Sequence, residues 1–257
     1  MFINPVILAQ IGVAWLFIRY LRQHDAGSKE PIRALLIAGI FGALATVGAF
    51  FLERWVLPDS LVTNPSSLLA PHLFDDSLLV GLIEEGLKSL PLAIFIYKRP
   101  YFNELSDGII YFGIAGMAFG LIENIGYDLS FGAVTGFFRI LAGPYMHAGL
   151  CALFGFMLAQ RKVMKINPIF VPLAFMAAVS LHGVYDFGIF YKHPVPMFIS
   201  LGITALVNIG VFLLFKYSRR IDSKLGLSAA GANYYCPHCG RPNPQRFLFC
   251  TYCGHKA

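Results

Sequence analysis

The segment GLIEEGLKSL, which begins at Gly81, places two glutamates and a lysine inside a stretch that is otherwise apolar. Glu84, Glu85 and Lys88 share one helix face, because residues three and four apart on a helix are neighbours. A charged side chain at mid-membrane costs roughly 2.5–3.5 kcal/mol. The competing interpretation is a structural buried ion pair, but two acids with one lysine leave a surplus carboxylate. We therefore predict that these three residues belong to an active centre.

Three further apolar segments carry ionisable side chains. Glu123 is followed by Asn124, which we interpret either as a site residue or as a polar contact between helices. His147 stands in a segment rich in small residues, which allow neighbouring helices to approach closely. His182 lies four residues before Asp186, and a carboxylate one turn away can orient an imidazole ring or serve as a second ligand.

Acids and imidazoles in a dry setting have a natural use, which is to activate water. In one route Glu84 or Glu85 is the general base towards a water molecule. In the other route a bound metal ion, zinc, lowers the pKa of the water to about 7. The candidate ligands of this catalytic metal are Glu123, His147 and His182. Both routes lead to hydrolysis, and the intramembrane setting favours a peptide bond of a membrane-embedded protein.

The composition shows which elements must position these residues. Of the 257 residues, 57% are hydrophobic and only 13% are charged, which indicates a polytopic membrane protein. We predict an all-α membrane helix bundle of about seven spans, each long enough for a hydrocarbon layer of about 30 Å. The first span lacks a basic n-region and a cleavage site, so we expect it to be retained. The spans are 4–21, 32–52, 77–97, 107–127, 140–160, 168–190 and 196–216.

The stretch between the fourth and fifth spans, LSFGAVTGFFRILAG, mixes glycine, threonine and Arg139. We interpret it as an interfacial or re-entrant segment that precedes the fifth helix.

Basic residues alternate between the two ends of the spans. Lysine and arginine gather at 19–33, 98–106 and 161–167 and after 216, whereas 53–76 is acidic. This bias predicts an integral protein of a bacterial or archaeal cell membrane, with its N-terminus outside and its C-terminus in the cytoplasm. It also accounts for the net charge of +6 without a nucleic acid. At 1.5 Å per residue, the ionisable residues of four helices then lie about 6–12 Å below the outer surface. We expect them to converge there.

The five cysteines divide into two kinds. Cys151 lies in an apolar span, and we interpret it as a packing residue rather than a nucleophile. The other four form two CxxCG knuckles with the spacing C-x2-C-x10-C-x2-C, which predicts a structural zinc site. Arg241 and Arg246 are too few to indicate nucleic acid, so we favour a cytoplasmic protein partner for this ribbon. The predicted zinc ligands are Cys236, Cys239, Cys250 and Cys253.

Three parts of the chain follow from these features. The membrane protease domain is predicted at 1–221, a polar linker at 222–233 and the zinc ribbon at 234–257. A domain as small as the ribbon has too little core to fold without metal.

The motifs also resemble a known family, the PrsW family of membrane proteases, which is distantly similar to CAAX-prenyl-protease and bacteriocin-processing enzymes. The resemblance covers about 77–190 and implies an intramembrane endopeptidase acting on a membrane-protein substrate within the lipid bilayer. The founding type makes the first cut in an anti-sigma factor. The matching motifs are EExxK (Glu84, Glu85, Lys88), FxxxEN (Phe119, Glu123, Asn124), His147 and HxxxD (His182, Asp186).

The resemblance implies that Glu84 and Glu85 are catalytic and that Glu123, His147 and His182 complete the centre. With Lys88 and Asp186, these are the predicted catalytic residues. Two other classes of function stay open. Intramembrane acids and histidines also build the proton paths of ion-coupled transporters. A scaffold that senses through its zinc ribbon is the third class, although it would not need the buried acids.

Overall fold

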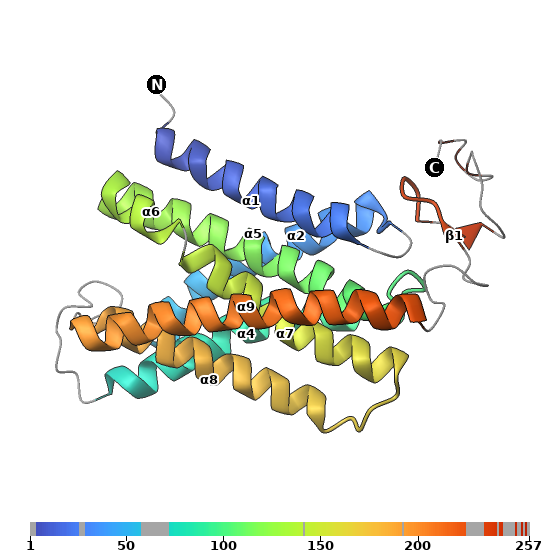
Figure 1. The fold of residues 1–257 in the computed structure, drawn as a ribbon. Helices are drawn as coiled ribbons and strands as arrows, with labels where there is room; N and C mark the ends of the chain where they lie inside the picture. The colour runs from blue at the N-terminus through green and yellow to red at the C-terminus, as the bar shows by residue number, and fades with distance from the viewer. Residues whose placement is uncertain are drawn as a thin grey trace.

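A computed structural model describes residues 4–25, 29–57, 72–140, 142–191, 193–224, 234–240 and 242–243, together with positions 250, 253 and 255. Figure 1 shows the arrangement of its helices and of the short β-ribbon that follows them. The helices within these residues are α1 (Pro5–His24), α2 (Ile32–Val56), α4 (Leu73–Ile96), α5 (Leu105–Phe131), α6 (Ala133–Arg139), α7 (Gly143–Val163), α8 (Phe170–Phe190) and α9 (Pro194–Lys224). The strands β1 (Tyr234–Tyr235) and β2 (Pro242–Asn243) pair in antiparallel fashion.

The predicted all-α bundle is confirmed, and each of the seven expected spans coincides with a helix. Among the described residues, six segments are long and apolar enough to cross a membrane, with α6 and α7 together forming one of them. The helix α4 has the length but not the composition, because it carries Glu84, Glu85 and Lys88. These three side chains are buried inside the bundle, so they lie on the face of α4 that is turned away from lipid.

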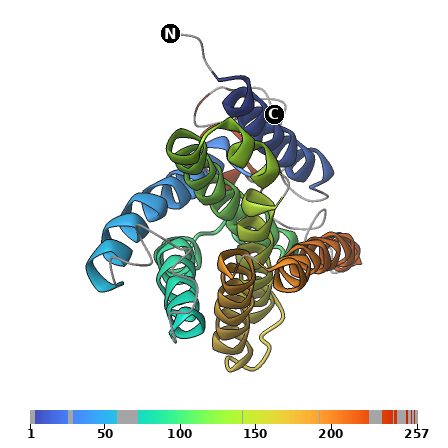
Figure 2. The same ribbon diagram turned by 90° about the vertical axis from the view of Figure 1, so that its left-hand side faces the viewer.

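The centre of the bundle is α5, which packs most extensively on α7 and also contacts α2, α1 and α9. Viewed from one end, α2, α4, α8 and α9 spread around α5 and α7 (Figure 2). A side chain at Gly116 would place its Cβ 2.3 Å from the carbonyl oxygen of His147, so only glycine permits this approach. Gly116 and Gly120 form a close-packing face that brings the end of α5 beside His147.

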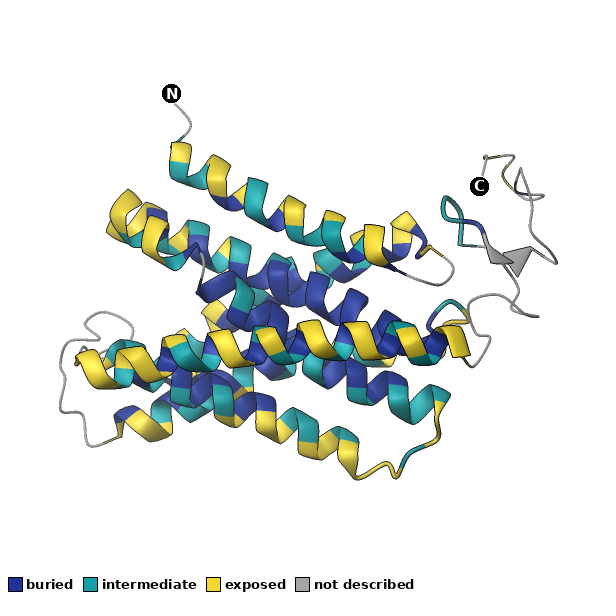
Figure 3. Ribbon diagram, in the orientation of Figure 1, coloured by how far each residue is buried: buried dark blue, intermediate teal, exposed yellow. Residues whose placement is uncertain are grey.

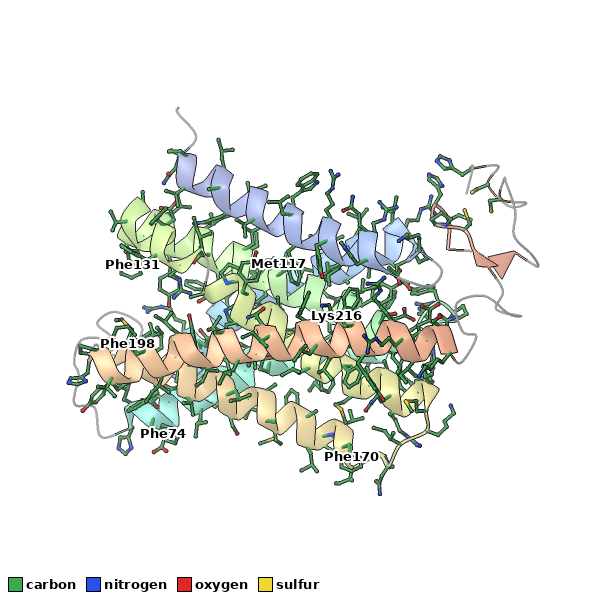
Figure 4. The ribbon with its side chains drawn as sticks, viewed as in Figure 1. Phe74, Met117, Phe131, Phe170, Phe198 and Lys216 are labelled. Atoms are coloured by element: carbon green, nitrogen blue, oxygen red, sulfur yellow. The ribbon has the colours of Figure 1, made fainter. Side chains whose placement is uncertain are left out.

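The outer faces of the bundle are apolar and exposed (Figure 3), as expected for helices in contact with lipid. Phe74, Phe131 and Phe198 lie towards one end, and Phe170 and Lys216 lie towards the other (Figure 4). The segment predicted to be interfacial forms the short helix α6, which follows directly on α5.

The ribbon lies at the end of the bundle that carries the α1–α2 connection. The backbone amide of Ile32 donates to the carbonyl oxygen of Pro237 at 2.9 Å, so the first knuckle caps the start of α2. Glu30, just before α2, is buried and accepts a hydrogen bond from the Tyr111 hydroxyl. Burial raises the pKa of Glu30 well above its ordinary value.

The start of α5 at the same end is capped by a carboxylate from α9. Asp222 is fully buried and accepts hydrogen bonds from the backbone amides of Leu105 at 2.8 Å and Ser106 at 3.0 Å. The predicted linker begins at this residue, and its larger part, 225–233, lies outside the described residues. Of the acidic stretch at 53–76, residues 58–71 are also outside them.

Candidate active site

The lysine of α4 joins both glutamates of the same helix to α7. Lys88 Nζ lies 2.8 Å from Glu85 Oε1 and 3.4 Å from Glu84 Oε2. It also lies 2.9 Å from His147 Nδ1. Lys88 therefore forms ion pairs with both carboxylates, and the shorter contact is the one to Glu85.

The histidine of α8 lies between two glutamates and an aspartate. His182 Nδ1 is 2.8 Å from Glu85 Oε1, and His182 Nε2 is 3.4 Å from Glu84 Oε2. Asp186 Oδ2 lies 3.3 Å from Nε2, as expected for residues four apart on one helix. Glu85 makes the shorter contact at Nδ1, so Glu85 rather than Asp186 fixes the orientation of this ring.

The histidine of α7 is held from behind by α5. His147 Nε2 lies 2.7 Å from Glu123 Oε2. The other oxygen of this carboxylate accepts a hydrogen bond of 2.8 Å from Arg139 of α6. Arg139 also donates to Asn124 Oδ1 at 3.0 Å, which shows that Asn124 contacts α6 rather than the two histidines of the centre.

These contacts leave three atoms facing one another from α4, α7 and α8. Ligand atoms of Glu84, His147 and His182 all lie within 4.8 Å of one another, and all three residues are buried. Glu123, expected among the metal ligands, instead lies behind His147, and Glu84 takes its place in this group. Two imidazoles and one carboxylate match a donor set that binds catalytic zinc in hydrolases.

The other predicted residues surround this group. Glu85 and Lys88 are fully buried, whereas the side chains of Asp186 and Glu123 are 13% and 20% exposed. Cys151 Sγ lies 3.7 Å from Glu85 Oε2 and is fully buried, which agrees with a packing residue.

One acidic side chain near the centre was not predicted to belong to it. Glu53 of α2 lies within electrostatic reach of Glu84, Glu123 and Asp186. Its Oε1 atom is buried and has no hydrogen-bond partner among the described residues. The sequence analysis assigned Glu53 to the acidic connection because the apolar run of the second span ends at residue 52. The helix α2 continues beyond this run, to Val56.

A close contact between α4 and α8 sets the distance between their side chains. A Cβ atom at Gly81 would lie 2.8 Å from the Val179 carbonyl oxygen and 3.3 Å from His182 Cβ. A Cβ atom at Gly183 would lie 2.8 Å from Leu78 Cα. The two helices therefore meet through paired glycines one turn away from Glu84 and Glu85.

The cysteines at the C-terminus form the second group that can hold a metal ion. Their ligand atoms lie within 4.8 Å of one another, with 3.5 Å between the sulfurs of Cys236 and Cys253 and 3.6 Å between those of Cys239 and Cys250. Bonds of about 2.3 Å to one tetrahedral zinc ion place sulfurs about 3.8 Å apart. The site therefore fits the predicted structural zinc. Arg241 and Arg246 lie outside the described residues.

Comparison with known proteins gives two family matches. A family model described as PrsW family intramembrane metalloprotease matches residues 30–215. A zinc-ribbon domain model matches residues 235–257.

Individual relatives agree with the first match. The chain is similar to Protease PrsW of Geobacillus kaustophilus, with 29% identity over 76% of this chain and 83% of the relative. It is similar to Protease PrsW of Bacillus subtilis, with 30% identity over 68% of this chain and 78% of the relative. Protease PrsW of Clostridioides difficile is 26% identical over 73% of this chain and 78% of its own length. No solved structure matches the chain.

Proposed function

The chain belongs to the PrsW family of intramembrane metalloproteases, and we propose that Glu84, His147 and His182 hold the metal ion with which it cleaves peptide bonds. The observation that supports this assignment most directly is the grouping of their ligand atoms within 4.8 Å. The family match favours the protease over the transporter and scaffold interpretations. Of the two routes to water activation, the donor set favours the metal.

The residues around the proposed ligands support the assignment. Histidines that bind metal ions donate a hydrogen bond from the N–H of their other ring nitrogen to a carboxylate or carbonyl, which fixes the tautomer and the orientation of the ring. His147 Nε2 contacts Glu123 at 2.7 Å, and His182 Nδ1 contacts Glu85 at 2.8 Å. Both rings therefore turn a lone pair towards Glu84, from His147 Nδ1 and His182 Nε2.

Peptide hydrolysis requires a group that moves a proton between water and the amine that leaves. A bound zinc ion would polarise the water and lower its pKa to about 7. We assign the proton transfer to Asp186, because its Oδ2 lies 3.3 Å from His182 Nε2 and its side chain is 13% exposed. Oδ2 accepts a proton as the water oxygen attacks the carbonyl carbon. It then returns this proton to the nitrogen as the C–N bond breaks.

Lys88 distinguishes the metal route from a glutamate route. Its Nζ is 2.9 Å from His147 Nδ1, so the ammonium group competes with a cation for the same lone pair. A mechanism in which Glu84 activates water without metal would leave this contact in place. The metal content of active protein separates the two mechanisms.

The substrates of this membrane protease are proteins embedded in the bilayer, and we propose a single-span protein of the anti-sigma factor type. The proposed site lies away from the end that carries the ribbon and the basic connections. With the ribbon in the cytoplasm and the N-terminus outside, the scissile bond is in the outer half of the membrane. At the opposite, cytoplasmic side of the membrane the ribbon would contact a cytoplasmic protein partner.

Cleavage of a purified single-span substrate tests the assignment. Glu84→Gln and His182→Gln should abolish cleavage, since each removes a proposed ligand. The matched controls Asp75→Asn and His193→Gln alter exposed residues and should cleave as the wild type does. Cleavage by Glu84→Gln at the wild-type rate would overturn the assignment.

A further inference from the structure

The structure assigns Arg139 of α6 as a positioning residue that acts on His147 through Glu123. This inference rests on the proposed function, because it concerns a ring proposed to bind the metal ion. No feature of the sequence motifs includes Arg139.

The first step is the division of Glu123 between two donors. Its Oε2 lies 2.7 Å from His147 Nε2, and its Oε1 lies 2.8 Å from an Arg139 guanidinium nitrogen. A carboxylate held at one oxygen alone can rotate about its terminal bond. With the second oxygen fixed by a charge-assisted hydrogen bond, the lone pair at Oε2 points at Nε2 in one orientation.

The second step is that Arg139 is itself held in place from several directions. Its Nε donates to Asn124 Oδ1 at 3.0 Å, and its guanidinium carbon lies 3.8 Å from the centre of the Tyr127 ring. The backbone of Gly143 lies beside it, where a Cβ atom would be in ordinary contact at 3.4 Å from the guanidinium. Glu123, Asn124 and Tyr127 are successive contacts along α5, so the arginine is aligned with that helix.

The third step concerns α6, a helix of seven residues that packs on α5 and α1. Gly132, with φ of +90°, separates it from α5. Its aromatic residues Phe137 and Phe138 are 61% and 75% exposed and face away from the protein. On the inner face, Gly136 packs against Asp128. Through its hydrogen bond to Glu123, Arg139 links this short helix to the catalytic centre.

The structure also explains why an arginine is required. Its planar group donates to Glu123 and to Asn124 at once, which the single ammonium group of lysine cannot do with the same geometry. Removal of a group that orients a metal-bound histidine typically costs about 10–100-fold in metal affinity or activity. Arg139 acts on His147 only through Glu123, so we expect a loss of about tenfold in kcat, at the lower end of this range. The KM should change little, because the inferred role of Arg139 is to orient His147 and not to bind substrate.

A double-mutant cycle with Glu123 tests the inference. Arg139→Gln should lower kcat about tenfold, and Arg139→Lys should recover part of the loss. In a Glu123→Gln background, Arg139→Gln should have no further effect, since its only route to His147 is already broken. With the four ribbon cysteines changed to serine, zinc retention against a chelator should follow the same pattern at an unchanged unfolding temperature. The control is Arg161→Gln, at the far end of α7, where the arginine bonds the Ile166 carbonyl.

Two outcomes would overturn the inference. One is that the effects of Arg139→Gln and Glu123→Gln multiply, as expected for a general loss of packing. The other is wild-type cleavage by Arg139→Gln. If Arg139→Gln does not fold, the cycle is made with Arg139→Lys, which keeps the charge. Glu84→Gln is assayed beside these variants. Wild-type cleavage by Glu84→Gln would refute the proposed metal site. If Glu84→Gln is inactive but the effects of the Arg139 and Glu123 substitutions multiply, only the role of Arg139 is refuted.

Discussion

Gly81→Ala tests whether the contact between α4 and α8 sets the geometry of the catalytic centre. The added Cβ would lie 2.8 Å from the Val179 carbonyl oxygen, 3.1 Å from Gly183 N and 3.3 Å from His182 Cβ. Ordinary contact begins at 3.4 Å. Because both nearest atoms are backbone, the helices must separate by about 0.6 Å to accept the methyl group.

This separation is enough to disturb the site one turn away. The distance of 2.8 Å between Glu85 Oε1 and His182 Nδ1 would grow to about 3.4 Å, beyond the usual range of an N–H···O hydrogen bond. A misplacement of the order of 1 Å can cost about 100-fold in rate. We expect kcat/KM to fall about 10–100-fold, which corresponds to about 1.4–2.7 kcal/mol of activation free energy.

The control is on the same helix. Gly86→Ala places the same methyl group where nothing lies within 4 Å. It should cleave as the wild type does and should unfold at the same or a higher temperature, since alanine favours a helix by about 0.5–1 kcal/mol over glycine. Both variants are compared by cleavage of one single-span substrate in the same vesicles. Equal rates for Gly81→Ala and Gly86→Ala would refute the reasoning.

Cys151→Ala should cleave at the wild-type rate and lose only about 1 kcal/mol of stability, and a loss of cleavage in the peptidase assay would show that the thiol takes part in the reaction. Cys236→Ser combined with Cys239→Ser should release the ribbon zinc and, by loss of the cap on Ile32, lower the free energy of unfolding by about 1 kcal/mol without slowing cleavage. Glu30→Gln should flatten the pH dependence of the unfolding temperature. The raised pKa of Glu30 means that, above its ordinary pKa of 4.5, the native state binds more protons than the unfolded state, so the wild type loses stability as pH rises. Identical pH profiles for the two proteins would contradict the burial of Glu30.

The convergence of the site could be predicted from the sequence for a physical reason. Charged residues inside apolar spans must find partners, and helical spacing fixes which residues of one span share a face. Glu84, Glu85 and Lys88 on one helix and His182 with Asp186 on another follow from this rule. The depth argument then brings these helices to a common level.

The pairing between helices could not be predicted in this way. Lys88 contacts both glutamates but lies closer to Glu85. This preference depends on the rotation of α4 against α7 and on the side-chain rotamer, and the sequence spacing determines neither. Glu123 was expected at the metal because it is an acid in an apolar span at the same depth as the two histidines. Only the geometry of α5 beside α7 places it at Nε2.

Arg139 and Glu53 were missed as site residues for a related reason. Arg139 was visible as the single charged residue in an apolar stretch, which indicates a buried partner, but a short helix after a break gives no periodicity to locate that partner. Glu53 lies past the apolar part of α2, where the helix continues for another turn. A boundary error of a few residues was enough to assign it to a connection.

The most direct test of the proposed centre is zinc X-ray absorption on the full chain with Cys236, Cys239, Cys250 and Cys253 changed to serine. The variant removes the ribbon ligands and leaves the membrane site intact. We predict one bound zinc ion in a shell of nitrogen and oxygen at about 2.0–2.1 Å, with imidazole scattering and no sulfur. Changing His182 to glutamine in this variant should abolish both the zinc and the cleavage. Cleavage by the variant without bound metal would contradict the metal centre.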